Sequence, residues 1–125
     1  MSDDKIALSS LPKTWLIDID GTIVKHNGHL NGEDELLSGV LEFFVKIPSG
    51  DTIIFLTSRS QSYESQTISF LQKHGIRYDK IIFDLPFGER ILVNDKKPSG
   101  LKTAYAINKE RDGELVVNFI VDEIL

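Results

Sequence analysis

Two carboxylates stand one residue apart directly after an apolar run. Residues 15–24 read WLIDIDGTIV, so the chain passes from three apolar side chains into Asp18 and Asp20. Acidic side chains are seldom buried unless a partner compensates their charge. We therefore expect a buried strand to end at this point and both acids to face a site beyond it.

Two further apolar runs of strand length, at residues 52–57 and 91–93, also lead into polar side chains. In an α/β sheet, ligands bind at the carboxyl ends of the strands, and parallel strands bring those ends to one edge. The sequence therefore predicts a shared site at this edge. The polar residues in or after the three runs are Asp18, Asp20, Thr57, Ser58, Arg59, Asn94 and Asp95.

The predicted site concentrates negative charge. Alternation along a strand puts Asp18 and Asp20 on one side while Ile19 turns away. Gly21 allows a sharp turn and the close approach of a ligand. Because clustered carboxylates repel one another, a hard divalent cation bound through oxygens would relieve the repulsion. We therefore expect Mg²⁺ as a cofactor.

The elements that position these residues alternate between strands and helices. Apolar residues at helical spacing precede and follow the central apolar run, and Gly75 stands where a helix typically stops. This order predicts a Rossmann-like α/β fold, with a parallel sheet and helices on both faces. The expected strands are 14–17, 52–57, 80–83 and 91–93, and the expected helices are 36–44, starting between 31 and 35, and 63–74.

The C-terminal part of the chain is harder to assign. Residues 103–108 alternate in a way that indicates an edge strand, and Asp112-Gly113 indicates a turn. Residues 115–120 favour a helix by spacing. The β-branched run VVNFIV at 116–121 leaves a strand as the alternative.

Composition limits the class of protein. The chain has 125 residues, enough for one domain spanning 1–125, and it contains no cysteine. Its net charge of −5 argues against nucleic acid as a partner, since binding there depends on cationic groups. No signal peptide and no membrane-spanning run is visible, so we expect a cytoplasmic protein with no membrane partner.

The order of motifs resembles the haloacid dehalogenase (HAD) superfamily of phosphohydrolases. An apolar strand leads into DxDGT, another into Thr57 and another into Asp95, and the likeness covers roughly residues 14–100. The resemblance implies that Asp18 is the nucleophile and that Asp20 is the general acid and base. It implies a phosphoryl contact from Thr57. Further residues placed at the substrate are Gly21, Thr22, Ser58 and Arg59.

The same resemblance implies a Mg²⁺ site. The ligands would be the carboxylates of Asp18 and Asp95 and the backbone carbonyl of Asp20. Asn94 stands where relatives often carry a further acid, and it could orient a metal-bound water.

The lysine that relatives supply to the phosphoryl group is missing from its usual place, which Leu85 occupies. Lys80 begins its strand and lies at the wrong end of the sheet. Lys96 and Lys97 follow Asp95, and we prefer Lys97 because Pro98 restricts the residue before it. Arg59 or a partner subunit are the alternatives for this cation.

The spacing of the motifs leaves no room for a cap domain. A capless protein must cover its site with a large substrate or a second copy, so a homo-oligomer is a possible assembly. The pattern TSR…GIRYDKIIF…NDKKPSG resembles small capless members associated with bacterial surface-polysaccharide synthesis. We therefore expect a small phosphorylated substrate, preferably a sugar phosphate. The alternative is a catalytically weak, metal-binding or regulatory relative.

Some candidate residues also have ordinary structural roles. Thr57 could cap the helix that follows it. His26 and His29 lie in a Gly/Asn-rich loop with no third metal ligand close in sequence, which favours ordinary loop residues that border the substrate. His74 suits the C-terminal end of its helix.

Overall fold

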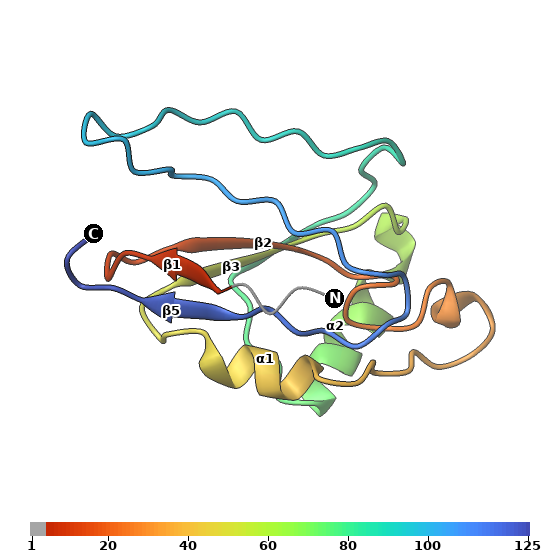
Figure 1. The fold of residues 1–125 in the computed structure, drawn as a ribbon. Helices are drawn as coiled ribbons and strands as arrows, with labels where there is room; N and C mark the ends of the chain where they lie inside the picture. The colour runs from red at the N-terminus through yellow and green to blue at the C-terminus, as the bar shows by residue number, and fades with distance from the viewer. Residues whose placement is uncertain (1–4) are drawn as a thin grey trace.

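A computed structural model describes residues 5–125 (Figure 1). This described part of the chain is of the mixed α/β class, with parallel strands, two α-helices and two short 3₁₀ turns. The elements in order are β1 Ile6–Leu8, β2 Thr14–Asp18, η1 Gly28–Leu30, α1 Val40–Lys46, β3 Thr52–Leu56, η2 Gln61–Tyr63, α2 Glu64–Lys73, β4 Lys80–Ile82 and β5 Phe119–Val121.

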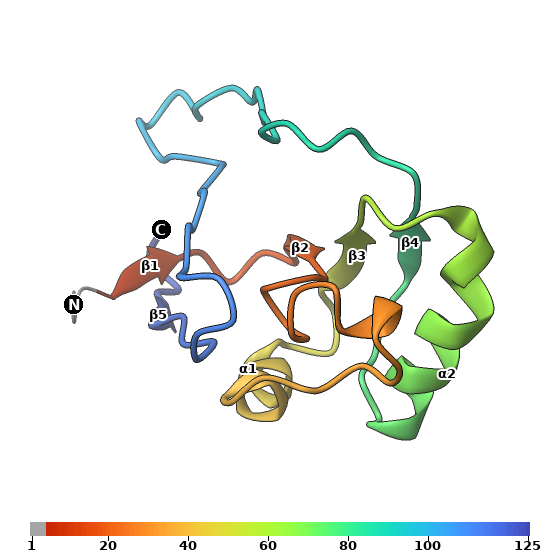
Figure 2. The ribbon, with the colours of Figure 1, turned by 90° about the vertical axis from the view of Figure 1, so that its right-hand side faces the viewer.

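The main sheet is parallel, with the order β2-β3-β4 (Figure 2). Thr14 pairs with Thr52 and Asp18 with Leu56, while Ile54 pairs with Lys80. The predicted strands at 14–17, 52–57 and 80–83 are therefore confirmed, and β2 extends to Asp18. This register brings the carboxyl ends of the three strands to one edge.

One face of this sheet forms the core. Ile53 and Phe55 of β3 are almost completely buried. They share a cluster with Phe43 of α1 and Leu71 of α2. The predicted helix at 63–74 is confirmed by η2 and α2, and Gly75 ends it with a φ of +66°. Both helices thus supply apolar side chains to the same face.

The opposite face of the sheet is open. Leu16 of β2 is 47% exposed and Ile82 of β4 is 43% exposed. The prediction of helices on both faces is wrong for the described residues. Residues 91–108 pass over this face as an extended excursion instead of a packed layer (Figures 1 and 2).

That excursion, residues 91–108, contains no strand. Ile91 and Val93 are 85% and 88% exposed. The predicted strands at 91–93 and 103–108 are therefore wrong, because no neighbouring backbone pairs with either run. Its hydrogen bonds are mostly local: the Lys97 amide donates to Leu101, and the Asn94 side chain donates to the Thr103 carbonyl.

The two ends of the described chain form a separate parallel pair, β1 with β5, in which Ile6 lies opposite Phe119. The helix favoured for residues 115–120 is wrong, and the strand alternative is confirmed for 119–121. The physical reason is the partner: β1 offers a backbone edge, and the Phe119 ring packs 5.3 Å from that of Trp15.

The first helix begins later than predicted, at Val40. Before it, the Lys25 amide donates to Glu35 and the Leu37 amide to Ile23, so this stretch pairs with the earlier loop instead of coiling. Gly39 stands at the helix start with a φ of +83°. A Cβ there would lie 2.5 Å from the Leu115 carbonyl oxygen, so only glycine fits.

Candidate functional site

Asp18 ends β2 at the carboxyl edge of the sheet. Its Oδ2 accepts a 3.0 Å hydrogen bond from the Thr22 hydroxyl, and its Oδ1 lies 2.9 Å from Nη1 of Arg90. The side chains of Asp18 and Arg90 are each 35% exposed. The site therefore offers an accessible carboxylate with one guanidinium beside it.

The loop after Asp18 turns back tightly through Gly21, whose φ is +82°. The predicted close approach at Gly21 is made by the chain itself, since a Cβ there would lie 3.1 Å from Cγ of Arg111. The Lys109 ammonium also donates a 2.9 Å hydrogen bond to the Gly21 carbonyl. Burial lowers the pKa of Lys109, and the charges of Asp112 and Asp18 only partly oppose it. Two more cationic side chains thus reach this loop.

Asp20 has a different partner, the buried Arg59. Nε of Arg59 donates to Oδ2 of Asp20 at 3.0 Å, and Nη2 donates to Oδ1 at 2.9 Å. The Arg59 side chain is 1% exposed and that of Asp20 is 16% exposed. The bidentate pair holds the Asp20 carboxylate in one orientation.

Asp34, in the loop before α1, binds the same guanidinium. Its oxygens accept from Nη2 at 2.7 Å and from Nη1 at 3.0 Å, and Nη1 also donates to the Thr67 hydroxyl at 2.9 Å. All five N–H donors of Arg59 are therefore used. Burial opposes the charge of Arg59, but the hydrogen bonds and charges of Asp20 and Asp34 outweigh it and raise its pKa.

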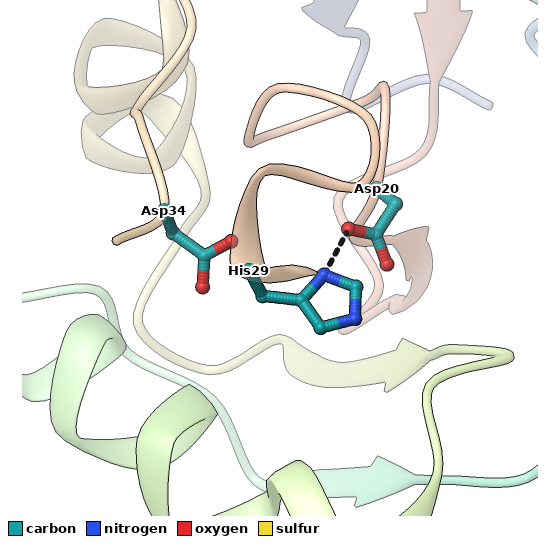
Figure 3. Close-up of side chains that lie close together, drawn as sticks. All are labelled: Asp20, His29 and Asp34. Atoms are coloured by element: carbon teal, nitrogen blue, oxygen red, sulfur yellow. Dashed lines mark ion pairs between the residues drawn. The ribbon is translucent and has the colours of Figure 1, made fainter. Parts of the chain in front are cut away.

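His29 lies between Asp20 and Asp34, and its ring is turned toward the Asp20 carboxylate (Figure 3). Its Nδ1 lies 3.5 Å from Oδ1 of Asp20, and its side chain is 6% exposed. Nδ1 is buried and has no hydrogen-bond partner. The ring stands edge-on to Tyr63 at 4.6 Å. Burial lowers the pKa of His29, and the charge of Arg59 lowers it further, so the ring is neutral near pH 7.

Asp20, His29 and Asp34 could together hold a metal ion. Their ligand atoms all lie within 4.8 Å of one another. A set of one nitrogen and two carboxylates suits several divalent metals, whereas Mg²⁺ prefers oxygen ligands and keeps several waters. The donor set therefore does not select Mg²⁺. The expectation that no third ligand lies near the two loop histidines is wrong for His29, because the turns of the loop bring Asp20 and Asp34 beside its ring.

The predicted Mg²⁺ site of Asp18 and Asp95 is not assembled. Asp95 is exposed in the excursion of residues 91–108. The adjacent Asn94 and the nearby Lys97 line a cavity of about 540 Å³ against β1 and residues 11–16. That cavity includes the amino-terminal part of β2, at the end opposite Asp18. These residues do not fit the implied Mg²⁺, because no strand at 91–93 carries Asp95 to the sheet edge.

The same geometry corrects the predicted cation. Lys97 faces the cavity and Lys96 is exposed, whereas the cation on Asp18 is Arg90. Sequence reasoning missed Arg90, although it is the one basic residue between Lys80 and Lys96. It also missed Asp34, for which no local pattern gives a signal.

Thr57 and Ser58 lie between β3 and Arg59. Thr57 is buried, and its hydroxyl accepts from the Arg59 amide at 3.0 Å. The Ser58 hydroxyl donates to the Pro86 carbonyl at 3.2 Å. The cap of the following turn is Ser60, so the capping alternative for Thr57 is wrong. Phosphoryl contacts from Thr57 and Ser58 stay predictions, while Arg59 has no free donor for a substrate.

Comparison with known proteins finds few similarities. No protein-family model matches the chain, and no curated protein is significantly similar to it. Among solved structures, one chain of "Structure of the Pnkp1/Rnl/Hen1 RNA repair complex" is similar, with a TM-score of 0.50 and 29% identity. The likeness covers 66% of this chain and 28% of that one, so this chain spans less than a third of its neighbour.

Within residues 5–125, no helix is both long enough and apolar enough to cross a bilayer.

Proposed function

We propose that this protein is a HAD-like phosphatase that hydrolyses phosphomonoesters, with Asp18 as the nucleophile. The observation that carries the proposal is that two acids one residue apart differ in exposure and in ion-pair partner. Asp18 is accessible beside Arg90, whereas Asp20 is held by the buried Arg59. Two carboxylates in different surroundings suit two chemical roles.

The proposed reaction has two steps. In the first, an Asp18 oxygen attacks phosphorus, the bond to the leaving oxygen breaks, and Asp20, which must be protonated for this step, gives that oxygen its proton. In the second, water attacks the phosphorus of the aspartyl-phosphate while Asp20 takes a proton from that water. The bond between phosphorus and the Asp18 oxygen breaks, which releases inorganic phosphate and restores the Asp18 carboxylate. These roles are the ones that the family resemblance implies.

Arg90 is proposed to supply the cation that both steps need. The attacking carboxylate and the phosphoryl group are both anionic, so a positive charge beside both is needed to bring them together. Arg90 already lies 2.9 Å from Asp18 on an exposed rim, where it can turn toward an arriving phosphoryl oxygen. No step is assigned to Mg²⁺, since Asp18, Asn94 and Asp95 are not gathered. Activity after chelation and after return of Mg²⁺ measures whether a metal is needed.

The substrate class rests on analogy. Capless relatives associated with surface polysaccharides favour a sugar phosphate. The similar solved chain belongs to an RNA repair complex, so a terminal phosphate on RNA is the second choice. A panel of sugar phosphates, nucleoside monophosphates and RNA with a terminal phosphate separates these classes.

One observation favours a second function. The trio of Asp20, His29 and Asp34 could hold a metal, whereas the family's metal ligands lie apart. A metal-binding or regulatory protein with little turnover would show tight binding of a divalent ion and no phosphatase activity on the panel. Titration calorimetry with Mg²⁺, Mn²⁺ and Zn²⁺ beside the activity screen decides between the two.

The central experiment replaces the nucleophile. Asp18→Asn should abolish turnover, because an amide cannot form the aspartyl-phosphate. Asp20→Asn should slow turnover by roughly 10²–10⁴-fold, the usual contribution of general acid–base catalysis. Glu89→Gln, beside Arg90 but exposed, is the control and should keep full activity. Wild-type activity in Asp18→Asn would refute the mechanism.

A further inference from the structure

Arg59 connects Asp20 to a residue on a different loop. Asp34 lies between η1 and α1, while Arg59 follows β3, and the two are joined by bonds of 2.7 and 3.0 Å. The Asp34 side chain is only 2% exposed. A carboxylate this deeply buried, bound to a fully used guanidinium, has no contact of its own with a substrate.

The arrangement makes the orientation of the Arg59 guanidinium depend on Asp34. Two carboxylates grip the guanidinium on adjoining edges, and Thr67 holds its remaining N–H. With Asp34 in place the plane of the guanidinium is set from both sides. Without it, Arg59 keeps only Asp20 and Thr67 and can tilt, and the bidentate bonds would carry the Asp20 carboxylate with it.

We propose that Asp34 is a positioning residue, which acts through Arg59 to aim the Asp20 carboxyl at the leaving-group oxygen. The inference rests on the proposed function, because it concerns the acid of that reaction. It assigns a role to the loop of residues 31–39, which places one buried acid on Arg59. The neighbouring Glu33 and Glu35 are exposed and serve as internal comparisons.

The test exploits the leaving group. Dinitrophenolate departs without a proton, whereas phenolate needs one, so only phenyl phosphate depends on a well-aimed Asp20 in the first step. The measured quantity is kcat/KM, which reports that step. In Asp34→Asn, kcat/KM should fall by roughly ten- to a hundredfold for phenyl phosphate, because part of the contribution of the acid is lost. For 2,4-dinitrophenyl phosphate, kcat/KM should fall by less than about threefold, because its leaving group needs no proton.

Controls separate positioning from folding. Glu35→Gln should leave both values unchanged. An equal loss on both substrates in Asp34→Asn would mean fewer folded molecules and would overturn the inference, and so would no loss on either. If Asp34→Asn does not fold, Thr67→Val removes one bond to Arg59 and should give a smaller loss of the same selective kind.

A second measurement distinguishes this inference from the proposed function. Thermal unfolding of Asp20→Asn, Asp34→Asn and the double variant forms a cycle that needs no activity. Shifts that do not add indicate that the two acids act on each other through Arg59. If the wild type hydrolyses neither ester, the phosphatase proposal fails even where coupling persists. If the shifts add, the link through Arg59 fails even in an active phosphatase.

Discussion

Residues 52–56 and residues 91–93 have similar apolar sequences, but the first run forms a buried strand and the second is exposed and forms no strand. Ile53 and Phe55 are 1% and 0% exposed in β3, whereas Ile91 and Val93 are 85% and 88% exposed. The first run has a strand on each side and helices over one face. The second has neither. An apolar β-branched run therefore becomes a strand only where other parts of the chain pair with its backbone and cover its side chains.

The charged residues divide in the same way. Arg59 and Arg90 each bind one acid of the DxD pair, but their side chains are 1% and 35% exposed. A buried, fully paired guanidinium is part of the fold. An exposed pair that contributes little to stability can exchange partners, as the proposed role of Arg90 requires.

The largest expected effect comes from breaking the buried network. Arg59→Met leaves Asp20 and Asp34 without their shared cation, and breaking such a pair typically costs about 3–5 kcal/mol. Arg90→Met should cost no more than about 1 kcal/mol, since exposed pairs contribute little. Urea unfolding of both variants measures the difference. Similar losses would contradict the contrast between the two arginines.

A core truncation tests the sheet directly. Phe55→Ala removes a completely buried ring from β3, and such changes cost about 3–5 kcal/mol through lost burial and a cavity. The free energy of unfolding from denaturant titration gives the value. A loss below about 1 kcal/mol would mean that the site refills or is not buried in solution.

A smaller effect concerns pH. The pKa of His29 is lowered from its usual 6.5 in the fold, so as pH drops below about 6.5 the unfolded chain takes up a proton first. The free energy of unfolding should therefore fall between pH 8 and acid pH. In His29→Gln the free energy of unfolding should depend less steeply on pH in the acid range. Near pH 8 its slope against pH should match that of the wild type, because the ring is neutral in both states there. An identical slope in the two proteins would exclude this contribution.

The smallest effect is expected in the excursion. Val93→Ser changes a side chain that is 88% exposed, so the free energy of unfolding should move by no more than about 0.5 kcal/mol. A much larger loss would show that residues 91–93 are covered in solution and that the two runs do not differ after all.

Local sequence pattern was sufficient to predict three strands of the main sheet and the second helix. The strands at 14–17, 52–57 and 80–83, the helix at 63–74 and its stop at Gly75 follow from alternation, helical spacing and the left-handed preference of glycine. The late start of α1 could not be predicted in this way. Its preceding residues bond to the loop after β2, and that partner lies beyond any local window.

The candidate site divides along the same line. The sequence by itself determined that a strand ends at Asp18 and that Asp20 follows it, because apolar residues run directly into two acids and a glycine. Only the tertiary structure decided their partners: Arg90 for Asp18, and Arg59 with Asp34 and His29 for Asp20. It also left Asp95 and Lys97 away from the site. The reason is that contacts between distant segments depend on which backbone edges and faces remain free, and local sequence does not encode that outcome.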